Sequence, residues 1–292
     1  MLARLQPMPR RLAILLFAFA AVALLALRAP VAPRRTTALG AFGRGPTVVL
    51  VHGLGSSASH WLPVARDLAR DHRVVLVELP GHGLAPMPGE LSLEDAAREL
   101  DLAILSECDG PVVLVGHSVG GLVAVAEALR DPDRVRALVL VETVLRPQLD
   151  SPACAELIAA LDRDYRGTLR KSYMAFGRDS AQGAALFAEA SNLDPAAMKT
   201  WIRLAITTDL SRRVAALRAP LLVVLSSRSW PDGETWRTCA DTLGYAAVPG
   251  ATPVRIERTG HFVMLDRAPL LADVIRRFEH GMAPQAFAAA AR

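Results

Sequence analysis

Short, uninterrupted runs of β-branched and other apolar residues recur along the chain. They occupy residues 47–51, 111–115, 137–141 and 221–225. Runs of this length without polar alternation are typical of parallel strands that are covered on both faces. Helix-forming segments separate them, such as the alanine- and leucine-rich residues 122–129. The pattern therefore predicts an α/β fold with a mostly parallel sheet flanked by helices.

A serine lies where one such strand meets the helix that follows it. Ser118 has Gly116 and Gly120 two residues away on each side, between the strand at 111–115 and the helix at 122–129. This G-x-S-x-G spacing is the pattern of a nucleophile elbow, a turn so sharp that a Cβ at either flanking position would clash with the neighbouring backbone. The strained turn lifts the hydroxyl out at the end of the sheet. We therefore predict that Ser118 is a catalytic nucleophile.

A nucleophilic serine needs a base, an acid that orients the base, and donors for the developing oxyanion. In this architecture the chain order is serine, acid, histidine, so the base is expected late in the chain. His261 fits, because it follows the short strand at 254–257 and a turn. The expected oxyanion donors are the backbone N–H of Val119, directly after the nucleophile, and that of Leu54, in the glycine loop at 52–55.

Four separated motifs occur in the order of a known family. They are His52-Gly53-Leu54-Gly55 followed by Trp61, then Leu79-Pro80-Gly81-His82-Gly83, the elbow at Ser118, and Gly260-His261-Phe262. On these motifs the chain resembles the α/β-hydrolases over about residues 45–280. The resemblance implies a mostly parallel eight-stranded sheet, and a helical cap inserted after the strand that ends near Val141. Only about twenty residues separate the apolar leader from Thr47, so the early edge of the sheet is expected to be trimmed.

The acid that orients the histidine is left open among three residues. Relatives carry Gly-x-x-Asp after the strand that corresponds to 221–225, but here Ser229 stands where the aspartate is expected. Glu142 is the preferred acid, because it ends a neighbouring strand and some relatives, including part of the haloalkane dehalogenase group, carry their acid at that strand end. Asp232 is the second candidate, although it lies in a Pro-Asp-Gly turn that needs no catalytic explanation. Glu234 is the third.

Trp61 and Phe262 are the candidate substrate contacts, because they flank the oxyanion loop and the base. Aromatic residues of the cap, Tyr173 and Phe176 among them, are expected to form cap core more often than substrate contacts. The sequence favours a serine hydrolase that cleaves carboxylic esters with a small to medium apolar acyl group through an acyl-enzyme. An acyltransferase, a carbon–carbon bond hydrolase and a catalytically decayed binding protein are the alternatives.

The two ends of the chain are predicted to lie outside the folded core. Three arginines precede sixteen uncharged residues at 12–27, which is the pattern of a signal anchor or signal peptide over residues 1–30. This pattern predicts a protein anchored in the bacterial inner membrane and facing the periplasm, or one that is secreted or periplasmic. The α/β-hydrolase core is expected at 31–145 and 218–282, the helical cap at 146–217 and a flexible tail at 283–292.

Charge and cysteine content argue against several other functions. The net charge of +4 comes from arginine, and no basic cluster with interleaved aromatic residues occurs, so nucleic acid is not an expected partner. The three cysteines, Cys108, Cys154 and Cys239, are an odd number without metal-ligand spacing to histidines. No glycine-rich phosphate loop follows a strand. We therefore expect no cofactor and no metal, and a small-molecule ester as the partner.

Overall fold

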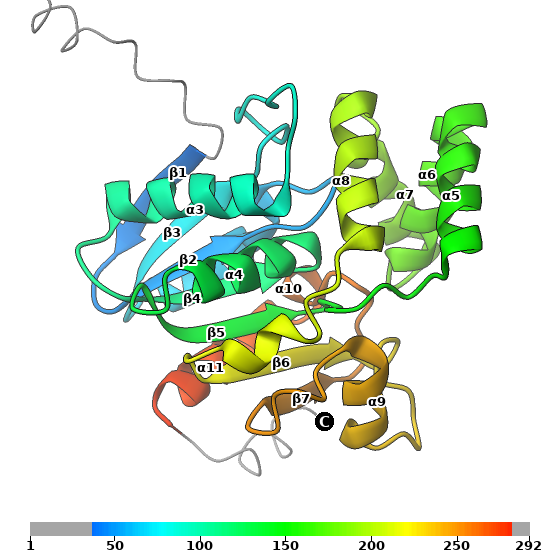
Figure 1. The fold of residues 1–292 in the computed structure, drawn as a ribbon. Coiled ribbons are helices and arrows are strands. Elements are labelled where there is room, and N and C mark those ends of the chain that lie inside the picture. Colours follow the sequence, from blue (N-terminus) through cyan, green and yellow to red (C-terminus); the bar gives the residue numbers. More distant parts are fainter. Residues whose placement is uncertain (1–36, 282–292) are drawn as a thin grey trace, which may run out of the picture. The chain divides into compact units, whose positions relative to one another are not determined.

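A computed structural model describes residues 37–281, and seven strands in this range form one sheet (Figure 1). The strands are β1 (Thr37–Gly43), β2 (Thr47–Val51), β3 (Arg73–Glu78), β4 (Val112–His117), β5 (Val135–Val141), β6 (Leu221–Ser226) and β7 (Thr252–Ile256). Their order is β1-β3-β2-β4-β5-β6-β7, with β1 antiparallel to β3 and the other pairs parallel. The predicted α/β class is confirmed. The described residues hold seven strands rather than eight, because a single strand precedes β2.

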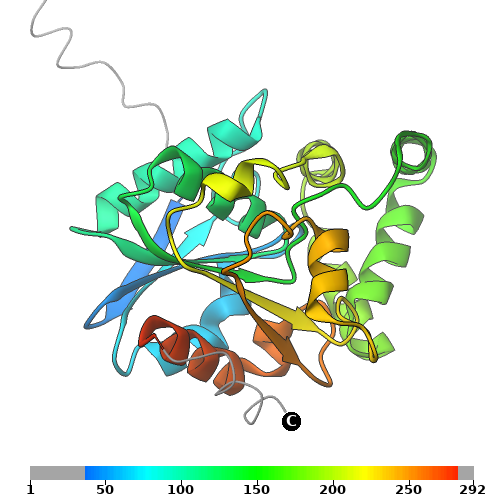
Figure 2. The ribbon, with the colours of Figure 1, turned by 60° about the horizontal axis from the view of Figure 1, so that its bottom comes forward.

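Helices cover both faces of this sheet (Figures 1 and 2). One face carries α3 (Leu93–Glu107), α4 (Val119–Arg130) and α9 (Trp236–Leu243), and the other carries α2 (Leu62–Leu68), α10 (Val263–Asp266) and α11 (Ala268–Glu279). Successive strand residues point to opposite faces. In β2, Val49 and Val51 enter the first core, whereas Val48 and Leu50 enter the second. Both faces are buried, which explains why the strands are apolar at every position.

Four helices lie between β5 and β6 and form a separate group beside the sheet (Figure 1). They are α5 (Ser151–Arg163), α6 (Tyr165–Phe176), α7 (Ser180–Ala190) and α8 (Pro195–Thr207). Each begins after an aspartate whose carboxylate accepts a hydrogen bond from the backbone N–H three residues on; these residues are Asp150, Asp164, Asp179 and Asp194. Such a cap contributes about 1 kcal/mol to helix stability. We refer to α5–α8 as the cap; the predicted domain boundaries stay predictions.

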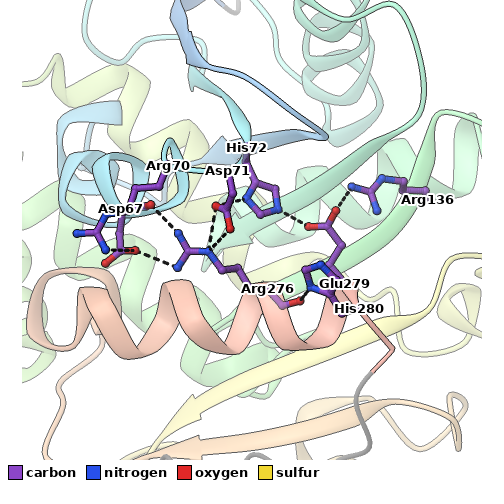
Figure 3. A network of polar contacts seen from close by, with 8 residues as sticks. All are labelled: Asp67, Arg70, Asp71, His72, Arg136, Arg276, Glu279 and His280. Atoms are coloured by element: carbon purple, nitrogen blue, oxygen red, sulfur yellow. Dashed lines mark hydrogen bonds and ion pairs between the residues drawn. The ribbon is translucent and has the colours of Figure 1, made fainter.

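A network of polar side chains connects α11 to the amino-terminal ends of the strands β3 and β5 (Figure 3). His72, directly before β3, lies 2.8 Å from the Asp71 carboxylate and 2.6 Å from that of Glu279 in α11. Glu279 also pairs with Arg136 of β5, and Arg276 of α11 pairs with Asp71. This network lies at the edge opposite to the strand ends that carry Ser118 and Glu142.

The prediction of a membrane anchor, or of a secreted or periplasmic enzyme, is wrong. Within residues 37–281, no helix is long and apolar enough to cross a membrane. The apolar run at 12–27 that motivated the prediction lies outside the described residues, as does the predicted tail at 283–292. The prediction was based on composition alone, and sixteen apolar residues are fewer than the roughly 20 that a membrane-spanning helix needs.

Candidate active site

Ser118 lies in the turn between β4 and α4, at the carboxyl end of the strand. Its backbone has φ 52° and ψ −121°, a conformation that costs a residue other than glycine of order 1–3 kcal/mol. A Cβ at Gly116 would lie 2.5 Å from the Cα of Gly121, and one at Gly120 would lie 2.1 Å from the carbonyl oxygen of His52. Both flanking positions therefore require glycine, and the turn has the shape that the spacing predicts.

A buried carboxylate contacts the ring of His261, which lies in the loop between β7 and α10. Oε2 of Glu142 is 3.1 Å from Nδ1 of His261, and the Glu142 side chain is fully buried. The same carboxylate accepts hydrogen bonds from the backbone N–H of Ser226 at 2.6 Å and from the hydroxyl of Ser229 at 2.9 Å. Glu142 also has a positive φ of 50°, which is rare for a residue with a side chain. Ser229, which stands where the resemblance to α/β-hydrolases implies an aspartate, is thus a donor to Glu142.

The other two candidate acids have different partners. The side chain of Asp232 is 94% exposed and pairs with Arg255. Glu234 is also exposed, and its carboxylate is 3.6 Å from Sγ of Cys239. Among the three acids that the sequence leaves open, the contact with His261 is made by Glu142.

The histidine is held from both sides, by the core and by the cap. Nε2 of His117 lies 2.9 Å from the backbone oxygen of His261. Burial and the neighbouring His261 hold the pKa of His117 well below its ordinary value, so His117 is neutral and donates this hydrogen bond. Phe176, at the end of α6, stacks on the His261 ring with the centroids 4.7 Å apart. The backbone carbonyl of Phe176 also accepts a hydrogen bond from the backbone N–H of His261 at 2.9 Å. These contacts fix the position of the imidazole.

Two histidines hold the glycine loop that follows β2. Nδ1 of His52 lies 2.8 Å from the carbonyl oxygen of Gly53, and its Nε2 accepts the backbone N–H of Leu79 at 3.1 Å. Nε2 of His82 accepts the backbone N–H of Gly55 at 3.1 Å. Burial, together with the nearby His52, lowers the pKa of His82 to about 3, so its ring is neutral and can accept. His82 belongs to the sequence motif at residues 79–83, but the motif does not predict its hydrogen bond with Gly55.

The two predicted oxyanion donors line one cavity together with Ser118. Val119 is the first residue of α4, and an N–H at this position has no acceptor within the helix. Leu54 lies in the glycine loop, and none of the loop's hydrogen bonds described above uses its N–H. Both groups are therefore available to bind a negatively charged oxygen.

Two cavities meet at Ser118 and His261, which line both of them. The first has a volume of about 170 Å³ and apolar walls, which include Leu157, Leu161, Leu169, Ile202 and Phe262. The second has about 760 Å³ and adds polar side chains, namely Gln148, Arg228, Glu234 and Thr242. Phe262 thus lines the apolar cavity. Trp61 is fully buried in the core between the sheet and the helices α2, α10 and α11, and it lines neither cavity.

A group of carboxylates lies outside this site. In the part of the chain that the structure describes, Asp101, Glu127 and Asp131 are close enough to share a metal ion. Arg130 already pairs with Glu127 and Asp101, and this positive charge opposes a bound cation. Burial raises the pKa of Glu127 to about 7, so near neutral pH this carboxyl is partly protonated, which also disfavours a bound cation.

Comparisons with known proteins agree with this fold. A family model described as "Alpha/beta hydrolase family" matches residues 48–274. Polyketide synthase ThaQ of Burkholderia thailandensis is 30% identical over 81% of this chain, and the pimeloyl-[acyl-carrier protein] methyl ester esterase of Xanthomonas campestris is 29% identical over 81% of this chain and 96% of its own. The match spans only 12% of the synthase, and 39% of the esterase of the same name from Aeromonas hydrophila. A hydrolase from Oleispira antarctica has a TM-score of 0.74 at 20% identity, over 85% of this chain and 95% of its own, which shows the fold.

Proposed function

The chain belongs to the alpha/beta hydrolase family, and from this premise we propose that it cleaves carboxylic esters through an acyl-enzyme. The predicted membership of the α/β-hydrolases is confirmed by the family match, and the likeness to a solved hydrolase supports the fold. The Xanthomonas campestris relative is named as a methyl ester esterase and matches along most of its length, which supports ester hydrolysis. The proposed triad and substrate class rest on the geometry of the site.

The observation that carries the proposal is the contact between Glu142 and His261, at 3.1 Å, beside the cavities that Ser118 lines. In the proposed mechanism, His261 accepts the proton of the Ser118 hydroxyl as the serine attacks the ester carbonyl. Glu142 orients the imidazole and stabilises the imidazolium that forms. His261 then gives the proton to the leaving alcohol, and later activates the water that releases the acid.

Leu54 and Val119 are the proposed oxyanion donors, since both line the cavity with Ser118 and offer backbone N–H groups. Preorganised donors of this kind contribute about 2.7–4 kcal/mol each to the barrier reduction in enzymes that have been tested by mutation. Because the tetrahedral oxygen forms on the carbonyl that Ser118 attacks, the two amides would converge on it from the elbow and from the glycine loop.

The apolar cavity is the proposed site of the acyl group. A dry cavity of about 150 Å³ with aliphatic and aromatic walls holds one benzene molecule, so the 170 Å³ here suits about six carbons. Each buried methylene contributes about 0.8 kcal/mol, which is roughly a fourfold gain in kcat/KM per carbon until the cavity is full. The alcohol would leave through the larger, more polar cavity, where Gln148 and Arg228 lie.

Hydrolysis of p-nitrophenyl esters from acetate to dodecanoate tests the proposal, with fluorophosphonate labelling measured in parallel. We expect kcat/KM to rise to about six carbons and then to level off or fall. Ser118→Ala should lose both turnover and labelling, with an unchanged unfolding midpoint. Turnover that survives in Ser118→Ala would refute the mechanism. An enzyme that labels at Ser118 but cleaves no ester would instead favour acyl transfer or carbon–carbon bond cleavage.

A further inference from the structure

The cap contacts the glycine loop directly, through the hydroxyl of a buried tyrosine. Tyr173 of α6 is 1% exposed, and its hydroxyl donates to the carbonyl oxygen of Leu54 at 2.8 Å. The contact depends on Gly55, which has a φ of +64°: a Cβ there would lie 1.9 Å from the Tyr173 hydroxyl oxygen and 2.9 Å from Cβ of Ala190 in α7. The loop and the cap are thus packed without room for a side chain between them.

This hydrogen bond completes the fixation of one peptide unit. The carbonyl of the Leu54–Gly55 peptide is held by Tyr173, and the N–H of the same peptide is held by His82 at 3.1 Å. The carbonyl of Gly53 is in contact with His52 Nδ1 at 2.8 Å. The Leu54 N–H lies between these two anchored carbonyls and takes part in neither bond. Its direction is therefore set by groups on both sides, one of which belongs to the cap.

A second connection runs from the cap to the same loop. The hydroxyl of Ser56 is 2.6 Å from Nδ1 of the buried His60, and Nε2 of His60 is 2.6 Å from the carboxylate of Glu189 in α7. Glu189 is half-exposed, so this connection ends at the surface of the cap. Two cap helices therefore brace the loop, α6 through a direct bond and α7 through a histidine.

We propose that Tyr173 is a positioning residue for the oxyanion site, so that the cap completes the catalytic machinery as well as roofing it. The inference rests on the proposed function, because it concerns the orientation of the Leu54 N–H in that reaction. Catalytic groups must be held within about 0.5 Å and 10–20° of their productive geometry, and a loop with several glycines needs outside support to meet this demand. The Tyr173 hydroxyl supplies such support, and it does so without touching the reacting atoms.

The test is Tyr173→Phe, which removes the hydroxyl and keeps the ring that lines the apolar cavity. Complete loss of an oxyanion donor costs about 10²- to 10³-fold in kcat, so a misdirected donor should cost about tenfold. KM for p-nitrophenyl hexanoate should change less than about twofold, because the cavity wall remains. Tyr165→Phe is the matched control: Tyr165 is on the same helix, and its buried hydroxyl has no hydrogen-bond partner among the described residues. It should keep wild-type kcat.

A ground-state and a tetrahedral ligand separate positioning from general damage. A hexyl trifluoromethyl ketone adds to the catalytic serine and places an oxyanion at the site, whereas hexanoate binds as a product. Tyr173→Phe should weaken the ketone by the same factor as kcat, and leave hexanoate binding and the control variant unchanged. Wild-type ketone affinity in a folded Tyr173→Phe, or a loss confined to KM, would overturn the inference.

Two further results keep the outcomes distinct. If Tyr173→Phe does not fold, Glu189→Ala cuts the second brace at a half-exposed residue, and wild-type kcat in that variant overturns the inference. If the wild-type enzyme cleaves no ester, the proposed function fails, and the ketone titration still reads the loop geometry through the serine adduct alone.

Discussion

Replacing Glu142 by glutamine changes one oxygen of a buried carboxylate into an amide nitrogen. The structure dictates which oxygen is lost. The Ser226 N–H donates to Oε1 at 2.6 Å, so the amide oxygen must stay at that position. The NH₂ group then takes the place of Oε2, which faces the Ser229 hydroxyl at 2.9 Å and Nδ1 of His261 at 3.1 Å. Glu142→Gln therefore presents a donor to a ring nitrogen that should itself donate.

The expected loss follows from the tautomer of the histidine. An NH₂ donor at Nδ1 moves the ring proton to Nε2, the nitrogen that must accept the proton of Ser118. In a serine protease, the equivalent change from acid to amide leaves the geometry intact and lowers kcat about 10⁴-fold. We expect Glu142→Gln to lower kcat by about 10³- to 10⁴-fold, which corresponds to about 4–5.5 kcal/mol of transition-state stabilisation.

Steady-state hydrolysis of p-nitrophenyl hexanoate measures this loss, with the unfolding midpoint as a check on folding. Asp232→Asn is the matched control, because that side chain is 94% exposed and pairs with Arg255 rather than with the histidine. It should keep kcat within about twofold. The reasoning is refuted if Glu142→Gln retains more than about a tenth of wild-type kcat, or if Asp232→Asn loses as much as Glu142→Gln.

Two other predictions concern stability. Gly55→Ala should destabilise the fold by about 2 kcal/mol or more in urea denaturation and lower kcat, because its Cβ would lie 1.9 Å from the Tyr173 hydroxyl at a φ of +64°; unchanged stability would show that the loop has more room than described. The pKa of His72 is raised, chiefly by its hydrogen bond to Glu279 and further by its hydrogen bond to Asp71, although burial acts in the opposite direction. A pKa that is higher in the folded than in the unfolded state contributes stability that is complete below about pH 6.5 and is lost as the pH rises through the folded-state pKa. The unfolding midpoint should therefore fall as the pH rises above about 6.5, and His72→Gln should make this fall smaller. An equal slope in both proteins would contradict this role.

The sequence foretells those parts of the structure that depend on neighbours in the chain. The apolar runs define the parallel strands because both faces of the sheet are buried, and the glycines around Ser118 define a turn that no larger residue could form. Which of Glu142, Asp232 and Glu234 contacts His261 does not follow from neighbours in the chain. Glu142 and Ser229 are 87 residues apart, and only the pairing of their strands brings the hydroxyl onto the carboxylate. Tyr173 carries no motif, because its partner Leu54 is 119 residues away.

The position of Glu142 has a geometric basis in the order of the strands. β5 lies between β4, which leads to Ser118, and β6, the strand after which the resemblance to α/β-hydrolases implies an aspartate. Val141 pairs with Val224, and the Glu142 N–H donates to the Val224 carbonyl at 2.9 Å. The Glu142 side chain therefore leaves the backbone about one strand spacing, roughly 4.8 Å, from the end of β6. Glutamate has one methylene more than aspartate, and the positive φ of Glu142 redirects its Cβ. At the position where the resemblance implies an aspartate, the Ser229 hydroxyl donates a hydrogen bond to the Glu142 carboxylate, whereas a second carboxylate there would repel it.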